Sequence, residues 1–180
     1  MERSRPRRAL FWLLAGSIVL LDVLTKWLAE HDLHPLRYDP REVVGPWVRL
    51  TLVYNRGAAF GLNLGPYSRW IFMCLTIVAL VILARLYRAT AAGERLRLIA
   101  IGLVCGGAVG NLIDRVRSDS GVVDFLDVGF ADHRWPTFNV ADIAVSVGAF
   151  LLAWALWGEE KVPDVAPSRE LSDAGAGVGD

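Results

Sequence analysis

"TFNVADIAVSVGAFLLAW", residues 137–154, is the stretch that decides the class of fold. It has the composition and length of an apolar helix that crosses a membrane. Near its start it carries one carboxylate, Asp142, with Asn139 three residues before it. A carboxylate inside a membrane costs several kcal/mol unless it is paired or hydrated. The stretch therefore predicts a membrane-spanning helix with a functional carboxylate close to one end.

The rest of the chain shares this apolar character, with 54% apolar residues and a positive mean hydropathy. Four apolar windows stand out, and each is near the roughly 20 residues that cross a bilayer core. They are residues 9–29, 70–87, 96–113 and 138–157. The sequence thus predicts an all-α polytopic membrane protein, with four transmembrane helices in one domain over residues 1–157.

A soluble helical bundle is the alternative, because the strictly uncharged runs are only 13 to 16 residues long. Runs of about 10–14 residues are often buried helices of soluble proteins. Two observations favour the membrane. The windows are apolar on all sides, and side chains typical of a membrane interface lie near their ends. These are Trp12, Trp27, Trp70, Tyr87, Trp154 and Trp157.

Basic residues predict the orientation of the spans. Four Arg lie within the first eight residues, and four more lie between Arg85 and Arg97. Short basic segments stay in the cytoplasm, so we expect both termini there and the connections 30–69 and 114–137 on the outer face. The polar residues 158–180 are expected to form a disordered cytoplasmic tail. A cleaved signal peptide is the alternative for the first window, but Asp22, Lys26 and the missing small-x-small cleavage site favour a retained helix.

The connection 30–69 is too long for a simple turn. Within it, "WVRLTLVY" (47–54) alternates partly between apolar and polar residues, which predicts a strand. The stretch "YNRGAAFGLNLG" (54–65) follows, and its glycines indicate backbone turns or a close approach. We expect a small extracytoplasmic sheet resting on the outer membrane surface.

Ionisable residues in or next to the apolar windows are the functional candidates. They are Asp22, Lys26, Asp114, Asp124 and Asp142, and the topology places all of them toward the outer side. The spacing of Asp22 and Lys26, i and i+4, favours a structural ion pair. Asp114, beside Arg115 at a helix end, also favours a structural salt bridge. Asp124 in "VVDF" and Asp142 in "NVAD" have no adjacent cation.

A short pattern occurs twice. "NLID" (111–114) ends the third window and "NVAD" (139–142) begins the fourth, so each places an Asn three residues before an Asp. Residues at this spacing share one face of a helical turn. Both patterns are expected at similar depth on the outer side.

Two carboxylates brought together at a partly desolvated site share one proton. Aspartic proteases use this arrangement, in which the ionised member activates water and the protonated member hydrogen-bonds the scissile carbonyl. The three His form no HExxH, and Cys74 and Cys105 show no metal-ligand spacing. A transporter would place ionisable groups nearer the midplane. A non-catalytic assembly factor remains a third reading, and it would tolerate Asn at both Asp positions.

Four motifs occur in order across the apolar windows: "NRGAAFG" (55–61), "GNLIDR" (110–115), "VVDF" (122–125) and "FNVAD" (138–142). Together they resemble the lipoprotein signal peptidase family, also called signal peptidase II, over about residues 9–157. The resemblance implies an aspartic endopeptidase of the bacterial inner membrane. Its substrates would be prolipoproteins, cleaved just before a Cys that carries a diacylglyceryl group.

The resemblance also implies roles for individual residues. Asp124 and Asp142 match the catalytic pair. Other positions match residues that shape the site, hold the substrate or support the structure: Asn55, Gly57, Asn111, Arg115, Asn139, Asp22, Lys26 and Asp114. The expected enzyme is a monomer surrounded by membrane lipid, needs no metal or cofactor and binds no nucleic acid. Its connection 30–69 would cradle the substrate.

Overall fold

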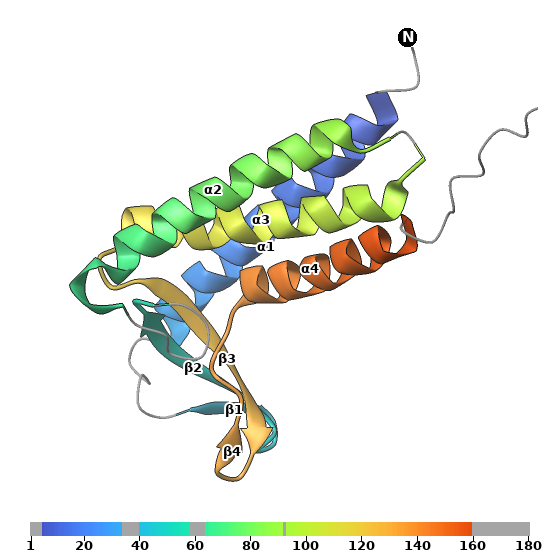
Figure 1. The fold of residues 1–180 in the computed structure, drawn as a ribbon. Coiled ribbons are helices and arrows are strands. Elements are labelled where there is room, and N and C mark those ends of the chain that lie inside the picture. The colour runs from blue at the N-terminus through green and yellow to red at the C-terminus, as the bar shows by residue number, and fades with distance from the viewer. Residues whose placement is uncertain (1–4, 34–39, 58–63, 92, 160–180) are drawn as a thin grey trace, which may run out of the picture.

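The computed structural model describes residues 5–33, 40–57, 64–91 and 93–159. Four long helices form a bundle: α1 (Arg5–Leu33), α2 (Ser68–Ala89), α3 (Arg95–Arg117) and α4 (Val140–Glu159). All four are long and apolar enough to cross a membrane, which confirms the prediction. Figure 1 shows that α1 begins and α4 ends at the same end of the bundle, while the sheet lies at the other.

The helices extend beyond the predicted ranges, and α1 begins at Arg5, four residues before its predicted start. α1 continues to Leu33 and α3 to Arg117, four residues beyond each predicted end. Charged residues in these last turns, such as Glu30 and Arg117, made the apolar windows stop early. A short 3-10 helix, η3 (Gly65–Tyr67), leads into α2. The expected tail, 158–180, lies almost entirely outside the described residues.

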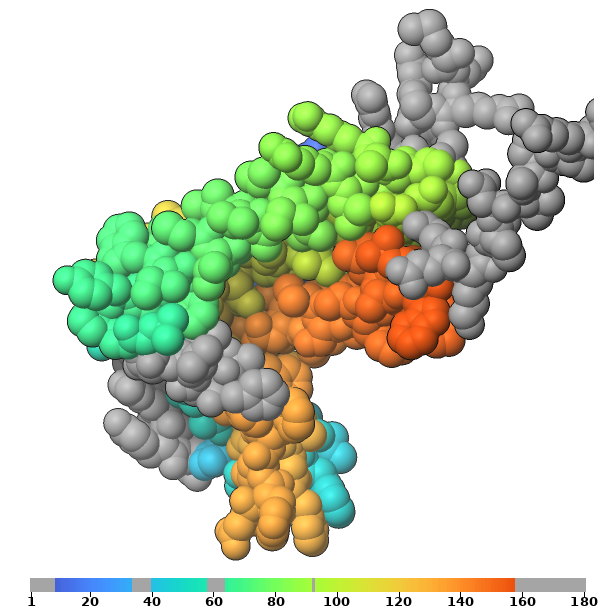
Figure 2. All heavy atoms as spheres, in the orientation of Figure 1, coloured from blue at the N-terminus to red at the C-terminus, as the bar shows by residue number. Residues whose placement is uncertain are grey.

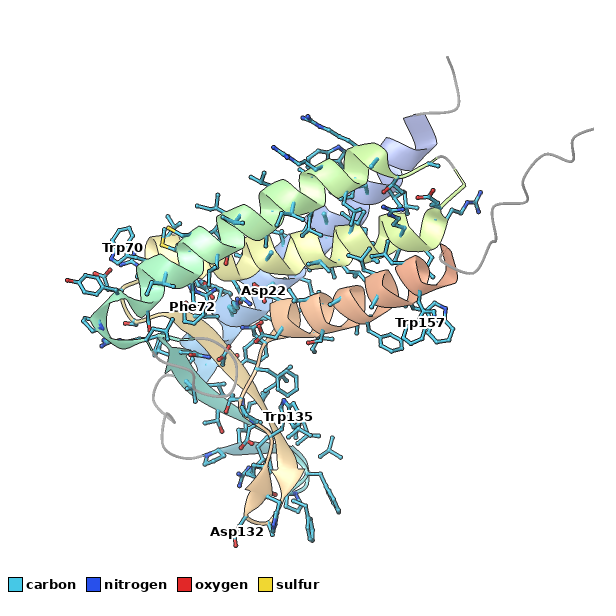
Figure 3. The ribbon with its side chains drawn as sticks, viewed as in Figure 1. Asp22, Trp70, Phe72, Asp132, Trp135 and Trp157 are labelled. Atoms are coloured by element: carbon cyan, nitrogen blue, oxygen red, sulfur yellow. The ribbon has the colours of Figure 1, made fainter. Side chains whose placement is uncertain are left out.

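The exterior of the bundle is apolar. Only Ser68 and Leu83 are buried in α2, and α4 exposes Val147, Phe150 and Trp154. Figure 3 shows Trp70 and Trp157 at opposite ends of the bundle. Side chains of this kind on the outside of a protein face lipid rather than water. The soluble alternative would require these residues to be covered.

Glycines let α3 pack closely against both of its neighbours. A Cβ atom at Gly106 would meet the Ala15 carbonyl oxygen of α1, and one at Gly107 would meet the Ala141 carbonyl oxygen of α4. Small residues at such contacts allow backbones to approach in membrane bundles. Because α1 and α4 both rest on α3, their charged residues at the sheet end come near those of α3.

The predicted sheet is present and has four antiparallel strands in the order β1-β2-β3-β4. They are β1 (Arg41–Val44), β2 (Val48–Asn55), β3 (Val122–Phe130) and β4 (His133–Arg134). β2 matches the strand predicted over 47–54. β3 was not predicted, because residues 122–125 are all buried and therefore show no alternation.

The sheet is attached to the bundle through a small apolar core. Leu52 of β2 and Val123 and Phe125 of β3 pack with Ala29 and Leu33 in the last turns of α1. From this attachment the sheet runs crosswise to the helices and projects beyond them (Figures 1 and 2). The packing of Val123 and Phe125 on α1 fixes the position of Asp124, which lies between them in the chain.

Candidate active site

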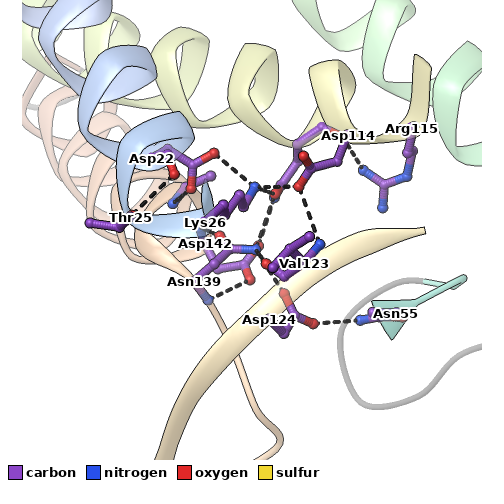
Figure 4. A network of polar contacts seen from close by, with 12 residues as sticks. Asp22, Thr25, Lys26, Asn55, Asp114, Arg115, Val123, Asp124, Asn139 and Asp142 are labelled. Carbon is purple, nitrogen blue, oxygen red and sulfur yellow. Dashed lines mark hydrogen bonds and ion pairs between the residues drawn. The ribbon is translucent and has the colours of Figure 1, made fainter. Parts of the chain in front are cut away.

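Polar side chains from α1, α3, α4, β2 and β3 meet where the sheet joins the bundle (Figure 4). All ten of the candidate site residues lie among the described residues. Asp22, Lys26, Asp114, Asp124 and Asn139 are buried. Burying so many polar groups is tolerable only when they are hydrogen-bonded or paired, and the contacts below satisfy them.

Lys26 is the cation at the centre of this cluster. Its ammonium lies 2.7 Å from Asp22 Oδ2 and 2.9 Å from Asp114 Oδ2, and it is only 1% exposed. It also donates a 2.8 Å hydrogen bond to Asn111 Oδ1. The predicted ion pair of Asp22 and Lys26 is therefore confirmed. Asp22 also accepts a hydrogen bond from the Ala141 backbone N–H, so this cluster joins α1, α3 and α4.

Asp114 is ion-paired as predicted, but Arg115, its neighbour in sequence, is not the partner. Its carboxylate binds Lys26 and, through Oδ1, Arg117 Nε at 2.9 Å. It also accepts the Val123 N–H of β3. Arg117 was not predicted as a partner because the helix was expected to end at residue 113. In a longer helix the i, i+3 spacing of Asp114 and Arg117 predicts this pair.

Asn111 and Asn139, one from each Asn–Asp pattern, form a hydrogen bond of 3.2 Å with each other. The Asn111 Oδ1 atom accepts from Lys26, which can only donate. The amide nitrogen of Asn111 is therefore turned away and donates to Asp142 Oδ1 at 2.8 Å. The buried ion cluster thus sets the orientation of a hydrogen-bond donor to Asp142.

Asn139 links the two carboxylates that lack a cation. Its Nδ2 atom donates to Asp124 Oδ1 at 2.7 Å. Its backbone N–H donates to Asp142 Oδ2 at 3.2 Å, and its Oδ1 accepts the Asp142 N–H at 2.9 Å. The reciprocal pair of bonds with Asp142 is a capping box at the start of α4. The same side chain that caps the helix therefore binds Asp124.

Asp124 and Asp142 have different surroundings. Asp124 is 2% exposed and accepts hydrogen bonds from Asn139 and from Asn55 Nδ2, the latter at 3.1 Å. Burial, with the charge of Asp142 nearby, raises the pKa of Asp124 to about 7. Asp142 is half-buried in the first turn of α4, where the helix dipole stabilises a negative charge.

Two other candidate residues hold the start of the glycine-containing motif. Asn55 Oδ1 accepts the Gly57 N–H at 3.0 Å, while the Gly57 carbonyl accepts from Arg115 at 3.1 Å. Arg115 also donates to the Asn111 carbonyl. The remainder of that motif, residues 58–61, lies outside the described residues. Arg115 thus ties the segment after β2 to the end of α3.

A cavity of about 380 Å³ opens beside Asp124. Asn55 and Gly57 line one part of it, and Pro136 and Thr137 line another. Sequence analysis did not single out Pro136 or Thr137, and no charge or spacing marks them. Among the described residues, no group of three or more His, Cys, Asp or Glu is placed to hold a metal ion. The site offers two carboxylates, amide donors and an adjoining space.

The profile of the family described as Signal peptidase (SPase) II matches residues 14–158. The chain belongs to the signal peptidase II family. A lipoprotein signal peptidase of Geobacter metallireducens is 38% identical over 158 residues, which cover 87% of this chain and 96% of that protein. One from Syntrophotalea carbinolica is 44% identical over 146 residues, covering 81% and 89%.

Solved structures agree with this assignment to signal peptidase II. A bacterial membrane enzyme, solved by the in meso method at 2.3 Å resolution, has a TM-score of 0.73 and 30% sequence identity. The match covers 85% of this chain and 90% of that one. The resemblance predicted from the four sequence motifs is confirmed, and the signal peptidase II chain described here is an integral membrane peptidase.

Proposed function

We propose that this chain hydrolyses the peptide bond just before a diacylglyceryl-modified Cys of a prolipoprotein, with Asp124 and Asp142 as its acid–base pair. As a signal peptidase II, it removes signal peptides from prolipoproteins. The observation that carries the proposal is the Asn139 side chain, which binds Asp124 and caps the helix turn that holds Asp142. Asn139 thereby links the two carboxylates, and Asp124 lines the adjoining cavity.

The different surroundings of the pair support separate roles. Asp124, buried and with a pKa of about 7, carries the proton and donates it to the scissile carbonyl oxygen. Asp142, which accepts hydrogen bonds from two N–H donors at the start of α4, takes a proton from water. The water oxygen then attacks the carbonyl carbon. When the intermediate collapses, the C–N bond breaks, the proton on Asp142 passes to the leaving nitrogen, and Asp124 takes back a proton from a hydroxyl group of the intermediate.

A lipid-modified Cys suits a site near the membrane interface, where the two carboxylates lie. The diacylglyceryl group partitions into the acyl-chain region and so holds the Cys near the interface. Asp124 and Asp142 lie at the sheet end of the apolar helices (Figure 4). With the termini in the cytoplasm, this end is the outer face of the inner membrane. The lipid then sets the height of the scissile bond relative to the two carboxylates.

Cleavage of matched precursors tests this proposal. Membranes containing the enzyme receive the same prolipoprotein with and without the diacylglyceryl group, and mass spectrometry identifies the new N-terminus. We expect the lipidated precursor to be cut directly before the modified Cys and the unmodified one to be cut far more slowly. Equal rates for both precursors would contradict the role given to the lipid.

The pH dependence of cleavage tests the role of Asp124. The protonated form is the acid, and its proton is lost as the pH rises through about 7. We therefore expect kcat/KM to fall on the alkaline side, by about tenfold for each further pH unit. The measurement is a profile from about pH 6 to about pH 9 in detergent, with enzyme stability checked at each pH. A rate that stays constant to the alkaline limit would contradict the assignment.

A further inference from the structure

Apolar side chains are exposed on one face of the sheet, at the end away from the helices. Trp47 and Phe130 are each 54% exposed, Trp135 60% and Val44 59%. The rings of Trp47 and Phe130 stack with their centroids 4.4 Å apart. With Val128, these residues form what we call the aromatic face: Val44, Trp47, Val128, Phe130 and Trp135. Large exposed apolar patches mark contact surfaces for proteins or membranes.

The aromatic face lies on the same side of the sheet as Asp124. Alternate residues of a strand project to one side, so Asp124, Leu126, Val128 and Phe130 of β3 share a face. Trp135 joins them because its backbone N–H donates to the Val128 carbonyl. The aromatic face therefore lies on the same side of β3 as the candidate active site, at the far end of the sheet.

Val44 belongs to this side through the strand register. Val44 pairs with Val48, and Val48 pairs with Val128. Glu42 pairs instead with Arg49, because the register of β1 shifts between Glu42 and Val44. Glu42 and Val44 therefore project to opposite faces although they are two residues apart.

Polar contacts on the opposite face hold this end of the sheet rigid. Asp127 Oδ2 accepts from Arg49 at 3.0 Å, and Asp127 Oδ1 accepts from Arg134 at 2.5 Å. Arg134 also donates to the Pro46 carbonyl. These contacts join β2, β3, β4 and the turn before β2. The exposed aromatic side chains are thus kept in place by an ionic cluster behind them.

The surroundings favour lipid as the partner of the aromatic face. The sheet runs crosswise to the helices (Figure 1), and Figure 3 shows Trp135 on the part that projects beyond them. When the helices span the membrane, a sheet that runs crosswise to them lies along the membrane surface. The lipid-facing residues Ile143 and Val147 of α4 are also exposed, so the surface that contacts lipid begins next to the sheet. Trp side chains favour the membrane interface.

We propose that the aromatic face inserts into the outer leaflet of the bilayer, the leaflet at the sheet end of the bundle. Insertion fixes the sheet at a defined depth and so holds Asp124 level with the lipid headgroups. The consequence for Asp124 rests on the catalytic role proposed above, but insertion itself does not. A cleavage assay tests the catalytic role of Asp124, and a depth measurement tests the insertion of the aromatic face. Either proposal can therefore be refuted without the other.

Spin labels on the two faces of β1 test the insertion. Cys74→Ser and Cys105→Ala remove the native thiols, and a nitroxide is attached to Val44→Cys or, as the matched control, Glu42→Cys. The protein is reconstituted in phosphatidylglycerol–phosphatidylcholine vesicles, and collisions with oxygen and with a water-soluble nickel chelate are measured. We expect the Val44 label at a depth of about 5–10 Å, as for other interfacial apolar faces, and the Glu42 label in water.

Adding Phe130→Ser and Trp135→Ser should move the Val44 label toward water while leaving the Glu42 label unchanged. Equal access of the nickel chelate to both labels in the unsubstituted sheet would overturn the proposal. Protection of the Val44 label from both reagents would also overturn it, since a protein surface would then cover the face. Spin–spin broadening at low protein-to-lipid ratio would identify that protein as a second copy.

Discussion

Asp124→Asn and Asp142→Asn should each reduce cleavage of a diacylglyceryl prolipoprotein by about 10²–10⁴-fold, the usual contribution of a general acid or base. Asn preserves the size of the side chain but cannot exchange the proton. In Asp142→Asn the base that activates water is lost. In Asp124→Asn the carbonyl oxygen receives no proton. The rate is measured in membranes at matched protein levels.

Asp132→Asn is the matched control, because Asp132 is an exposed carboxylate in the turn between β3 and β4. It should cleave at the wild-type rate. The melting temperature of each variant in detergent separates lost chemistry from lost structure. A folded enzyme that keeps near wild-type activity with Asn at both positions would refute the aspartic mechanism. The assembly-factor reading would then be the better one.

Lys26→Met should be the most destabilising single substitution in the site. It leaves Asp22 and Asp114 buried without the shared ammonium that lies within 2.9 Å of both. Removing one partner of a buried ion pair costs about 3–5 kcal/mol. Loss of the bond to Asn111 also frees its amide to rotate away from Asp142. Thermal unfolding in detergent measures the loss.

Arg85→Met, a change of the same kind at an exposed position of α2, should leave the melting temperature nearly unchanged. The triple variant Lys26→Met, Asp22→Asn, Asp114→Asn also removes the two carboxylate charges that have lost the ammonium and should recover much of the stability. If Lys26→Met melted at the wild-type temperature, the ion cluster would contribute nothing to the fold. If the triple variant recovered the melting temperature but not the cleavage activity, this would show that Lys26 also positions Asn111.

The sequence predicted the parts of this protein that depend on local pattern. The apolar windows identify four spans because crossing a bilayer requires long apolar runs. The alternation of 47–54 identifies β2, and the i, i+4 spacing identifies the pair of Asp22 and Lys26. β3 was not predicted, because its first residues are buried on both faces of the strand, against α1 and in the polar site.

Contacts between distant segments could not be deduced from spacing. Each Asn–Asp pattern places its two side chains on one face of a turn, and in the second pattern Asn139 and Asp142 do hydrogen-bond each other. Asn111, by contrast, donates to Asp142 on another helix rather than to Asp114. Which helix ends meet depends on the glycine contacts of α3. Before the structure, Asp124 and Asp142 stood out because neither has an adjacent cation, and the resemblance to a family implied that they form the catalytic pair.

The double role of Asn139 has a consequence for biosynthesis. Asp124 and Asp142 lie on β3 and on α4, which leaves the ribosome after the other three described helices. Until α4 has packed and its first turn has been capped by Asn139, Asp124 lacks the Asn139 donor and the neighbouring carboxylate of Asp142. A partly inserted chain therefore contains no complete pair. If this pair is the acid–base pair proposed above, the nascent peptidase gains both of its catalytic groups only when α4 has been inserted.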